Sequence, residues 1–333
     1  MSFIEQSERR GGLARRVFLF LGLGFLAFIV GGFFWATSTP GTSWEGPTGT
    51  PQDGQLQTRL EEHVLRMAST PRSLASATGI MRTQEYIELE LLSLGYDVER
   101  QEVVPPANNL IVSIAATDAA APTLIVGAHY DTVSDSPGAD DNASGVAALL
   151  ELGRLLKARD GLAVNNIELV FYANEEPPYF KTTAMGSYVH AQSIEDTNSV
   201  LGMISLETMG YFSEEPSSQN YPFPLSLRYP STGNFIAFAG DTTSRDFLRQ
   251  IVGEFRDYAK LPSVGGTMPS VVQGIDWSDH WAYSEAGIPA IMVTDTAIFR
   301  NPHYHRASDT PDTLDYRRLA LVVEGLEKVL SSK

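Results

Sequence analysis

Five short stretches of the chain carry histidine or acidic side chains, and three of them come directly after apolar runs. They are His129-Tyr130-Asp131, Asp140-Asp141, Asn174-Glu175-Glu176, Glu207, and the segment that contains His303 and His305. Each stretch alone has an ordinary explanation, such as a surface pair, a helix cap or a solvated acidic loop. Together they offer only His and carboxylate groups, in a chain without cysteine. Two histidines and three carboxylates are the ligand set of two zinc ions that share one bridging carboxylate.

The spacing within these stretches suits a metal site. Residues i and i+2 of an extended chain face the same side, so Asp131 can orient the imidazole of His129. Consecutive side chains point to opposite sides, so one of Glu175 and Glu176 can bind a metal while the other faces the water that the metal activates. Glu207 ends an apolar run, where a carboxylate without a partner would be costly to bury.

The elements that must position these residues form an alternating pattern. Apolar strand-like runs alternate with amphipathic helical stretches, which indicates an α/β sandwich with a mostly parallel, buried sheet. Ligands bind at the carboxyl ends of strands in such sheets. Strands are predicted at 109–115, 123–129, 167–173, 200–206, 234–239 and 290–294, and helices at 56–68, 82–94, 145–157, 243–258 and 316–330.

Residues 17–36 form an uncharged apolar stretch that is long enough to span a membrane. Its 20 residues, at a rise of about 1.5 Å each, match a hydrocarbon core of about 30 Å. Four arginines precede it within residues 9–16, and the next basic residue after it is Arg59. This asymmetry predicts that residues 1–16 are cytoplasmic and that the remainder is periplasmic or extracellular. A cleaved signal peptide is the alternative, although its apolar core usually has only about 7–15 residues.

The rest of the chain is predicted to be a linker and one domain. Residues 37–55 are rich in Pro, Gly, Ser and Thr, which predicts a flexible linker, and residues 56–333 form the domain.

The chain of 333 residues carries 40 acidic and 24 basic side chains, a net charge of -16 that argues against nucleic acid as a partner. The lack of cysteine excludes disulfides, thiolate metal sites and a cysteine nucleophile.

Six motifs resemble, in their order along the chain, those of the dinuclear-zinc aminopeptidases of the bacterial leucine aminopeptidase type. This family is related to glutamate carboxypeptidase and to the transferrin receptor ectodomain. The motifs are HYDT (129–132), GADDNASG (138–145), NEE (174–176), SLET (205–208), SDH (278–280) and HRASDT (305–310). The resemblance covers about residues 56–330. It implies a three-layer α/β/α sandwich of the zinc-peptidase, phosphorylase/hydrolase-like type, and an enzyme that hydrolyses the N-terminal bond of a peptide substrate.

The resemblance also implies a role for each matching residue. One zinc ion is expected to take His129, Asp140 and Glu207, and the other to take Asp140, Glu176 and His305, so that Asp140 is the bridge. Glu175 is the expected general base, which takes a proton from a water activated by the two metals. Five further residues are expected to support these ligands without binding metal: Asp131, Asp141, Asp279, His280 and Asp309.

Several alternatives stay open at this point. His303 competes with His305 for the second histidine position. Some family members place a tyrosine before the SDH motif to assist the developing oxyanion, but this chain has Trp277 there. Tyr304 or Tyr179 could substitute. Mn or Co could replace zinc at such ligands. The same fold could also serve a carboxypeptidase, a single-zinc glutaminyl cyclase or a non-enzymatic receptor-like module.

One long segment of the chain has no counterpart in the resemblance. Phe212–Gly233 is rich in proline and aromatic residues and also contains acidic residues. It is expected either to line a specificity pocket or to cover the sheet.

Overall fold

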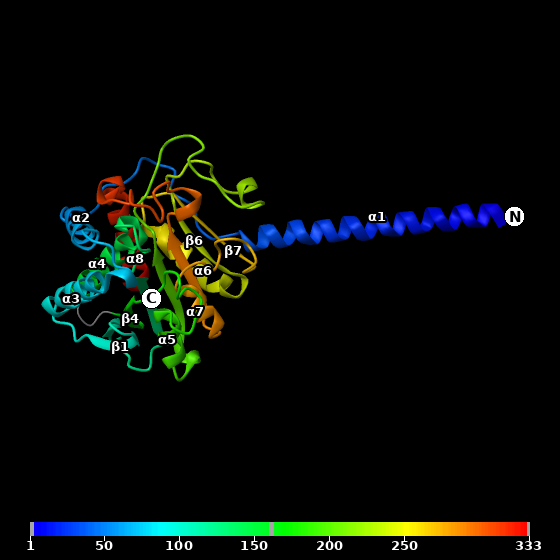
Figure 1. The fold of residues 1–333 in the computed structure, drawn as a ribbon. Coiled ribbons are helices and arrows are strands. Elements are labelled where there is room, and N and C mark those ends of the chain that lie inside the picture. Colours follow the sequence, from blue (N-terminus) through cyan, green and yellow to red (C-terminus); the bar gives the residue numbers. More distant parts are fainter. Residues whose placement is uncertain (1–2, 160–162, 332–333) are drawn as a thin grey trace. The chain divides into compact units, whose positions relative to one another are not determined.

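The computed structural model describes residues 3–159 and 163–331 of the chain. These residues form two compact units, Met1–Ser38 and Thr39–Lys333. The first unit contains the long helix α1 (Phe3–Ala36), drawn in blue in Figure 1. Its segment Phe18–Ala36 is long and apolar enough to cross a membrane. Phe18, Phe20 and Phe28 in that segment are largely exposed, as expected for a helix that is not part of a globular core.

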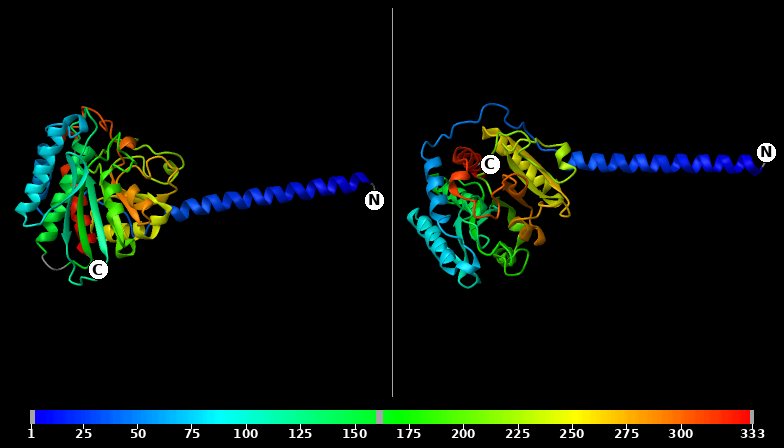
Figure 2. Two further views of the ribbon diagram at one scale, coloured as in Figure 1. Left: turned by 60° about the horizontal axis from the view of Figure 1, so that its bottom comes forward. Right: turned by 45° about the horizontal axis from the view of Figure 1, so that its top comes forward.

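The second unit is built on one mixed sheet of eight strands (Figures 1 and 2). Their order across the sheet is β1-β2-β4-β3-β5-β8-β6-β7. The neighbours β4, β3, β5 and β8 run parallel to one another, whereas β1–β2, β2–β4 and β6–β8 are antiparallel pairs and β6–β7 is parallel. The strands are β1 (Glu99–Val104), β2 (Ala107–Ile114), β3 (Thr123–His129), β4 (Asn166–Tyr172), β5 (Val200–Glu207), β6 (Ile236–Asp241), β7 (Ser263–Met268) and β8 (Ala290–Thr294).

Helices cover both faces of this sheet, which makes three layers. The helices are α2 (Leu56–Met67), α3 (Ala77–Ser93), α4 (Gly145–Lys157), α5 (Gly186–Ser193), α6 (Arg245–Tyr258), α7 (His280–Glu285) and α8 (Tyr316–Ser331). Leu110 and Val112 of β2 pack in the larger apolar core with α2, α3, α4, α6 and α8. Ile111, between them, packs in a second core with α5 and α7. The period of two along each strand thus supplies both cores, and the three-layer α/β/α sandwich is confirmed.

Residues 39–55, which are most of the predicted linker (37–55), are hydrogen-bonded along the domain. Arg256 of α6 donates to the Thr39 hydroxyl (2.9 Å) and to the Pro40 carbonyl (2.8 Å). The Gly49 amide donates to the Lys260 carbonyl at 3.0 Å, and a Glu324 carboxylate oxygen accepts from the Asp53 amide at 2.9 Å. Charged side chains of α6 and α8 therefore satisfy backbone groups that this Pro- and Gly-rich segment cannot pair within itself. We refer to residues 39–55 as the strap.

Candidate active site

The parallel strands bring the candidate residues to one edge of the sheet. His129 is the last residue of β3 and Glu207 is the last residue of β5. Glu175 and Glu176 follow β4, and His305 lies in the connection from β8 to α8. Because β4, β3, β5 and β8 are neighbours that point the same way, their carboxyl ends meet at this edge.

Two groups of side chains at this edge share a single carboxylate. In the first group, His129 Nε2 lies 3.3 Å from Asp141 Oδ1 and 3.2 Å from Glu207 Oε2. In the second group, His305 Nε2 lies 3.0 Å from Asp141 Oδ2 and 3.3 Å from Glu176 Oε1. The ligand atoms of each group lie within 4.8 Å of one another. Asp141 thus presents one carboxylate oxygen to each histidine.

Asp141, and not Asp140, therefore lies between the two histidines, whereas the resemblance assigned the bridging role to Asp140. Asp141 has an extended backbone (φ -109°, ψ 90°), so the two adjacent side chains point in different directions. Asp140 faces the connections behind the site, where its carboxylate accepts hydrogen bonds from the Gly210 amide (2.8 Å) and the Asn301 side-chain amide (2.7 Å). Burial, followed by the charge of Asp295, raises the pKa of Asp140 well above its usual range.

The loop that carries Asp141 is held from two sides. Asp309 accepts hydrogen bonds from the amides of Asp140 (2.9 Å) and Asp141 (3.2 Å), so it supports the loop through the backbone. Gly138 has a positive φ of 63°, and a β-carbon there would lie 2.3 Å from the Asp141 carbonyl oxygen. Only glycine fits that close approach.

Arg72 is a structural residue of this site that the sequence did not reveal. Its side chain is completely buried. It donates to the main-chain carbonyls of Tyr130 (2.7 Å), Pro137 (2.7 Å) and Gly138 (2.8 Å), and so joins the segment after β3 to the loop before Asp141. An isolated arginine beside a proline carries no sequence signal for this role.

Asp131 connects both ends of the site. One of its oxygens lies 3.5 Å from His129 Nδ1, and its two oxygens accept hydrogen bonds from the amides of Glu175 and Glu176, each at 3.0 Å. The backbone that presents the two glutamates is therefore fixed by the same carboxylate that orients the imidazole. On the opposite side, the Ser278 hydroxyl donates to Glu207 Oε2 at 2.8 Å.

The remaining candidates lie around these groups. Asp279 is fully buried, and burial raises its pKa to about 7. His280 points away from the two groups, with Nε2 2.8 Å from the Ile275 carbonyl. His303 contacts the Ser308 hydroxyl at 3.0 Å through Nδ1. Of the two competing histidines, His305 is the one that the structure brings to Asp141 and Glu176.

Dense negative charge changes the protonation of the site. Burial alone would lower the pKa of His129, but the charges of Glu207 and Glu175 raise it well above its usual value. Asp141 and Glu176 likewise outweigh burial at His305 and raise its pKa to about 10. Burial raises the pKa of Glu175 well above its usual value, and the charges of Glu207 and Glu176 add to the effect. Burial, followed by the charge of Asp141, raises the pKa of Glu176 to about 8.

The donor set fits divalent metal ions. His129 Nε2 and Glu176 Oε1 are buried without a hydrogen-bond partner among the described residues. Buried polar atoms without partners are rare, and a ligand-binding role accounts for these atoms. Imidazole nitrogens and carboxylate oxygens are ligands of zinc, and the shared Asp141 can serve two ions. The residues present therefore suit a two-metal centre.

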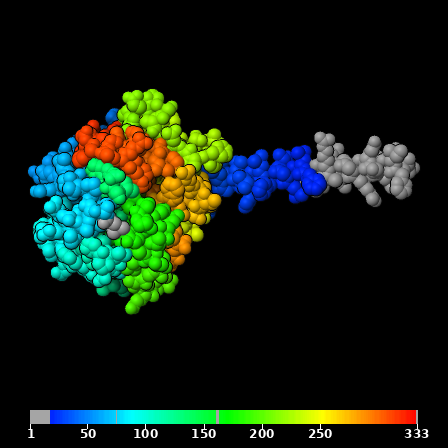
Figure 3. Space-filling view, in the orientation of Figure 1, coloured from blue at the N-terminus to red at the C-terminus, as the bar shows by residue number. Residues whose placement is uncertain are grey.

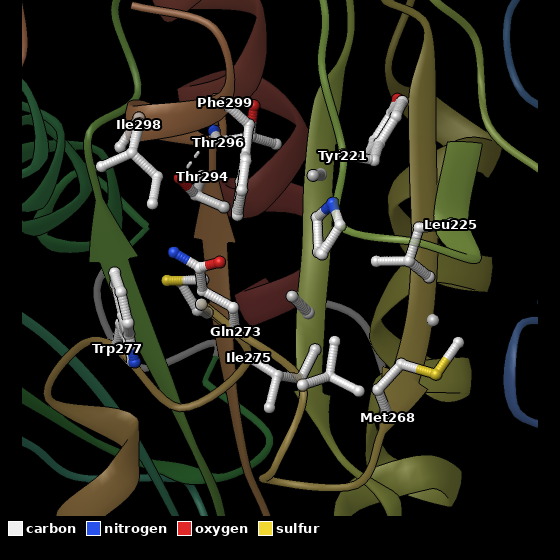
Figure 4. Close-up of a pocket in the computed structure, with 18 of the residues that line it drawn as sticks. Tyr221, Leu225, Met268, Gln273, Ile275, Trp277, Thr294, Thr296, Ile298 and Phe299 are labelled. Carbon is white, nitrogen blue, oxygen red and sulfur yellow. Dashed lines mark hydrogen bonds between the residues drawn. The ribbon is translucent and has the colours of Figure 1, made fainter.

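An apolar cavity of about 120 Å³ lies beside this centre. Glu207 and Tyr304 lie among its lining residues, and β6, β7 and β8 form its wall. Figure 4 shows Tyr221 and Leu225 opposite Trp277 across the cavity. The segment Phe212–Gly233 thus contributes to the lining, which was one of its two expected roles. Tyr304 also stacks on the His305 ring, with 3.9 Å between the ring centres.

Comparison with known proteins places the chain in a family. The family model for Peptidase family M28 matches residues 109–329. The chain is 41% identical to the uncharacterized protein YfbL of Escherichia coli strain K12, over 82% of this chain and 87% of that protein. It is 28% identical to a probable leucine aminopeptidase of Arthroderma otae, over 75% of this chain but only 63% of the fungal protein.

Solved structures share the fold at low sequence identity. LapB from Legionella pneumophila has a TM-score of 0.65 at 19% identity, and the match covers 89% of this chain and 78% of LapB. A glutaminyl cyclase from Tannerella forsythia has a TM-score of 0.59 at 18% identity, and the match covers 83% of this chain and 98% of the cyclase. These likenesses show the fold, whereas the family match and the sequence relatives show the enzyme class. The chain belongs to peptidase family M28 and is a peptidase hydrolase.

Proposed function

We propose that this chain is a zinc-dependent aminopeptidase with two zinc ions, anchored in a membrane through residues 17–36. The observation that carries the two-metal part is the position of Asp141 between His129 and His305. The N-terminus is cytoplasmic and the catalytic domain periplasmic or extracellular, because the arginines of residues 9–16 lie on one side of the apolar segment.

The ligand assignment follows the two groups. One zinc ion would be held by His129, Asp141 and Glu207, and the other by Asp141, Glu176 and His305. When bound, the two ions supply Lewis acidity to the scissile carbonyl and lower the pKa of a water molecule. Asp131 keeps the imidazole of His129 oriented, with Oδ1 3.5 Å from Nδ1.

Glu175 is the proposed general base. Its Oε2 lies 4.0 Å from His129 Nε2, so the carboxylate reaches the site without belonging to either ligand group. Burial raises the pKa of Glu175, which brings the carboxylate closer to the pKa range in which a group both accepts and returns a proton at neutral pH. Glu175 takes a proton from the attacking water and delivers it to the leaving amine.

Two further features select the substrate. The cavity, lined mainly by apolar side chains, receives the side chain of the first residue of the peptide. The excess of carboxylates at the strand ends favours a free, positively charged α-amine over a blocked one. The Tyr304 hydroxyl, at the junction of the cavity and the ligand groups, donates to the carbonyl oxygen as negative charge develops on it.

The test is a Glu175→Gln variant assayed on leucyl peptides with free and acetylated N-termini, with zinc measured on the same preparation. The wild-type chain should contain two zinc ions and cleave only the free peptides. The variant should keep both ions and lose about 10²–10⁴-fold in kcat, the usual contribution of general base catalysis.

Glu176→Gln is the matched control, because it removes a carboxylate from a ligand group and should lower the zinc content instead. Full zinc occupancy with near-normal turnover in Glu175→Gln would remove the base assignment. One zinc ion per wild-type chain, with cyclisation of N-terminal glutamine in place of hydrolysis, would identify the cyclase alternative that shares this fold.

A further inference from the structure

Three exposed apolar side chains stand at the rim of the cavity. Val271 is 88% exposed, Phe223 80% and Leu227 75%, and no other large apolar side chain among the described residues of the second unit is as exposed. Their neighbours Pro222, Leu225 and Val272 line the cavity, so all three belong to its rim. We call Phe223, Leu227 and Val271 the apolar tip. Neighbouring apolar side chains with this exposure mark a surface that meets an apolar partner.

The loop that carries Phe223 and Leu227 is held to the domain by hydrogen bonds at both of its ends. Arg300 donates to Gln219 Oε1 at 2.7 Å, and the Gln219 side-chain amide donates to the Thr296 hydroxyl at 2.8 Å. At the other end of the loop, the Tyr229 hydroxyl donates to the Gly265 carbonyl at 2.9 Å. Figure 3 shows the yellow-green segment of this loop standing out from the surface. Phe223 and Leu227 are therefore presented outward on a loop that is hydrogen-bonded at both ends.

The charge around the tip is unusual for this chain. The chain carries a net charge of -16, yet residues 216–233 contain Arg228 and no acidic side chain. Apolar side chains beside a basic residue suit the boundary between lipid tails and phosphate headgroups. The negatively charged lipid headgroups would repel an acidic surface, whereas residues 216–233 contain no acidic side chain.

The same strand holds both the loop and the start of the domain. The Thr39 methyl group lies against Gly265 of β7, whose carbonyl accepts the Tyr229 hydroxyl. Only Thr37 and Ser38 separate Thr39 from Ala36, the end of the apolar helix. An extended chain of three residues spans at most about 11 Å. A membrane that holds the apolar helix must therefore come close to Thr39, and so to the strand on which the loop is fixed.

We propose that the apolar tip inserts into the surface of the membrane in which the N-terminal helix is anchored. The cavity then opens beside the lipid, where it meets apolar peptide segments that lie at the membrane surface. The inference rests on the anchoring part of the proposed function and is independent of the peptidase chemistry.

The experiment uses the absence of cysteine, because one substitution then places one fluorescent label on the full chain. The chain is reconstituted in phosphatidylcholine–phosphatidylglycerol liposomes with and without nitroxide-labelled lipid, which quenches fluorophores within the bilayer. Labels are placed at Phe223→Cys and Val271→Cys. Gly24→Cys, inside the apolar helix, is the positive control. Leu65→Cys and Leu89→Cys replace exposed apolar residues of α2 and α3 and are matched negative controls.

The proposal expects that nitroxide lipid removes most of the emission at positions 24, 223 and 271 and leaves positions 65 and 89 unchanged. A Phe223→Ser/Leu227→Ser double variant should abolish quenching at Val271→Cys, while a soluble dipeptide is still cleaved at the wild-type rate. Neither replaced side chain lines the cavity, so this activity also reports correct folding.

Three results would overturn the proposal. Quenching at position 24 without quenching at 223 and 271 would leave the anchor intact and the tip in water. Emission at 223 that changes with the number of chains per liposome, and not with nitroxide lipid, would identify a second copy as the occupant. Absence of quenching at position 24 would show that the helix is not in the bilayer, and both the anchor and the lipid contact would then be rejected.

Discussion

Two adjacent aspartates of the same loop have different surroundings, and this difference predicts different effects of the same substitution. Asp141 lies between His129 and His305, so Asp141→Asn should reduce zinc content at both positions and abolish activity. Asp140 accepts hydrogen bonds from the Gly210 amide and from Asn301, and it should not bind metal. Asp140→Asn turns one acceptor into a donor, so it should keep both zinc ions and lower the free energy of unfolding by about 1–3 kcal/mol.

Zinc analysis and denaturant unfolding of the two variants separate these outcomes. If Asp140→Asn loses zinc while Asp141→Asn retains it, the original assignment from the resemblance is right and the bridging position proposed from the structure is wrong.

The raised pKa of His305 predicts how zinc binding responds to pH. In the zinc-free protein, Asp141 and Glu176 raise this pKa to about 10, so Nε2 is protonated throughout the neutral range. Zinc and the proton compete for this atom, and the protonated fraction falls as the pH rises towards 10. The apparent zinc affinity should therefore increase between pH 6 and pH 9, by about tenfold per pH unit for each proton released. Competition with a chelator of known pH dependence measures this slope, and a flat profile would contradict it.

At the scale of whole elements, the buried inner strands could be predicted from the sequence, and the two edge strands could not. The inner strands β2, β3, β4, β5, β6 and β8 all overlap the ranges predicted as strands, because each contains an apolar run. The edge strand β1 was missed because four of its six residues (ERQEVV) are charged or polar and none is fully buried, and β7, with the sequence SVGGTM, was missed because two glycines interrupt it. Edge strands need fewer buried side chains, so they carry a weaker pattern.

The same distinction holds for the candidate site: residues marked by a local sequence pattern could be predicted, and residues that depend on the tertiary structure could not. The residues at strand ends could be found because a charged group after an apolar run is conspicuous. The choice between Asp140 and Asp141 could not be made, because it depends on the backbone angles of the loop. Arg72 could not be found either, because its partners at residues 130 and 137–138 are far away in the sequence.

Arg72 gives the prediction at this scale. It joins two functional segments through main-chain carbonyls, and lysine cannot reach all of these acceptors with one ammonium group. Arg72→Lys should therefore lower the free energy of unfolding by about 1.5–3 kcal/mol for each charge-assisted hydrogen bond lost, and it should also lower zinc content. Arg100→Lys, on the exposed pair with Glu88, is the matched control and should change stability by at most about 1 kcal/mol. Equal effects of the two substitutions would argue against a structural role for Arg72.

At the scale of the whole molecule, we expect the strap to belong to the folded domain, which would then begin near Thr39 and not at residue 56. A flexible linker would add nothing to the domain, whereas the strap is bound along most of its length. Its last part enters an ionic cluster in which one oxygen of Asp53 contacts both Arg59 (2.5 Å) and Arg154 (2.9 Å). Arg59 and Arg154 also share Glu151, which is almost fully buried. Replacing Asp53 therefore leaves Arg59 and Arg154 with Glu151 as their shared carboxylate partner.

Two truncated chains test whether the strap belongs to the domain. A chain of residues 39–333 retains the strap, and a chain of residues 56–333 begins where the sequence predicted the domain to begin. The shorter chain loses the hydrogen bonds of the strap to Arg256, Lys260 and Glu324, each worth about 0.5–1.5 kcal/mol. Its Tm should accordingly be several degrees lower, since about 1 kcal/mol shifts the Tm of a large domain by roughly 2–4 °C. Asp53→Asn in the longer chain should reproduce part of the loss. Equal Tm values for the two truncated chains would mean that residues 39–55 act as the free linker that their composition suggests.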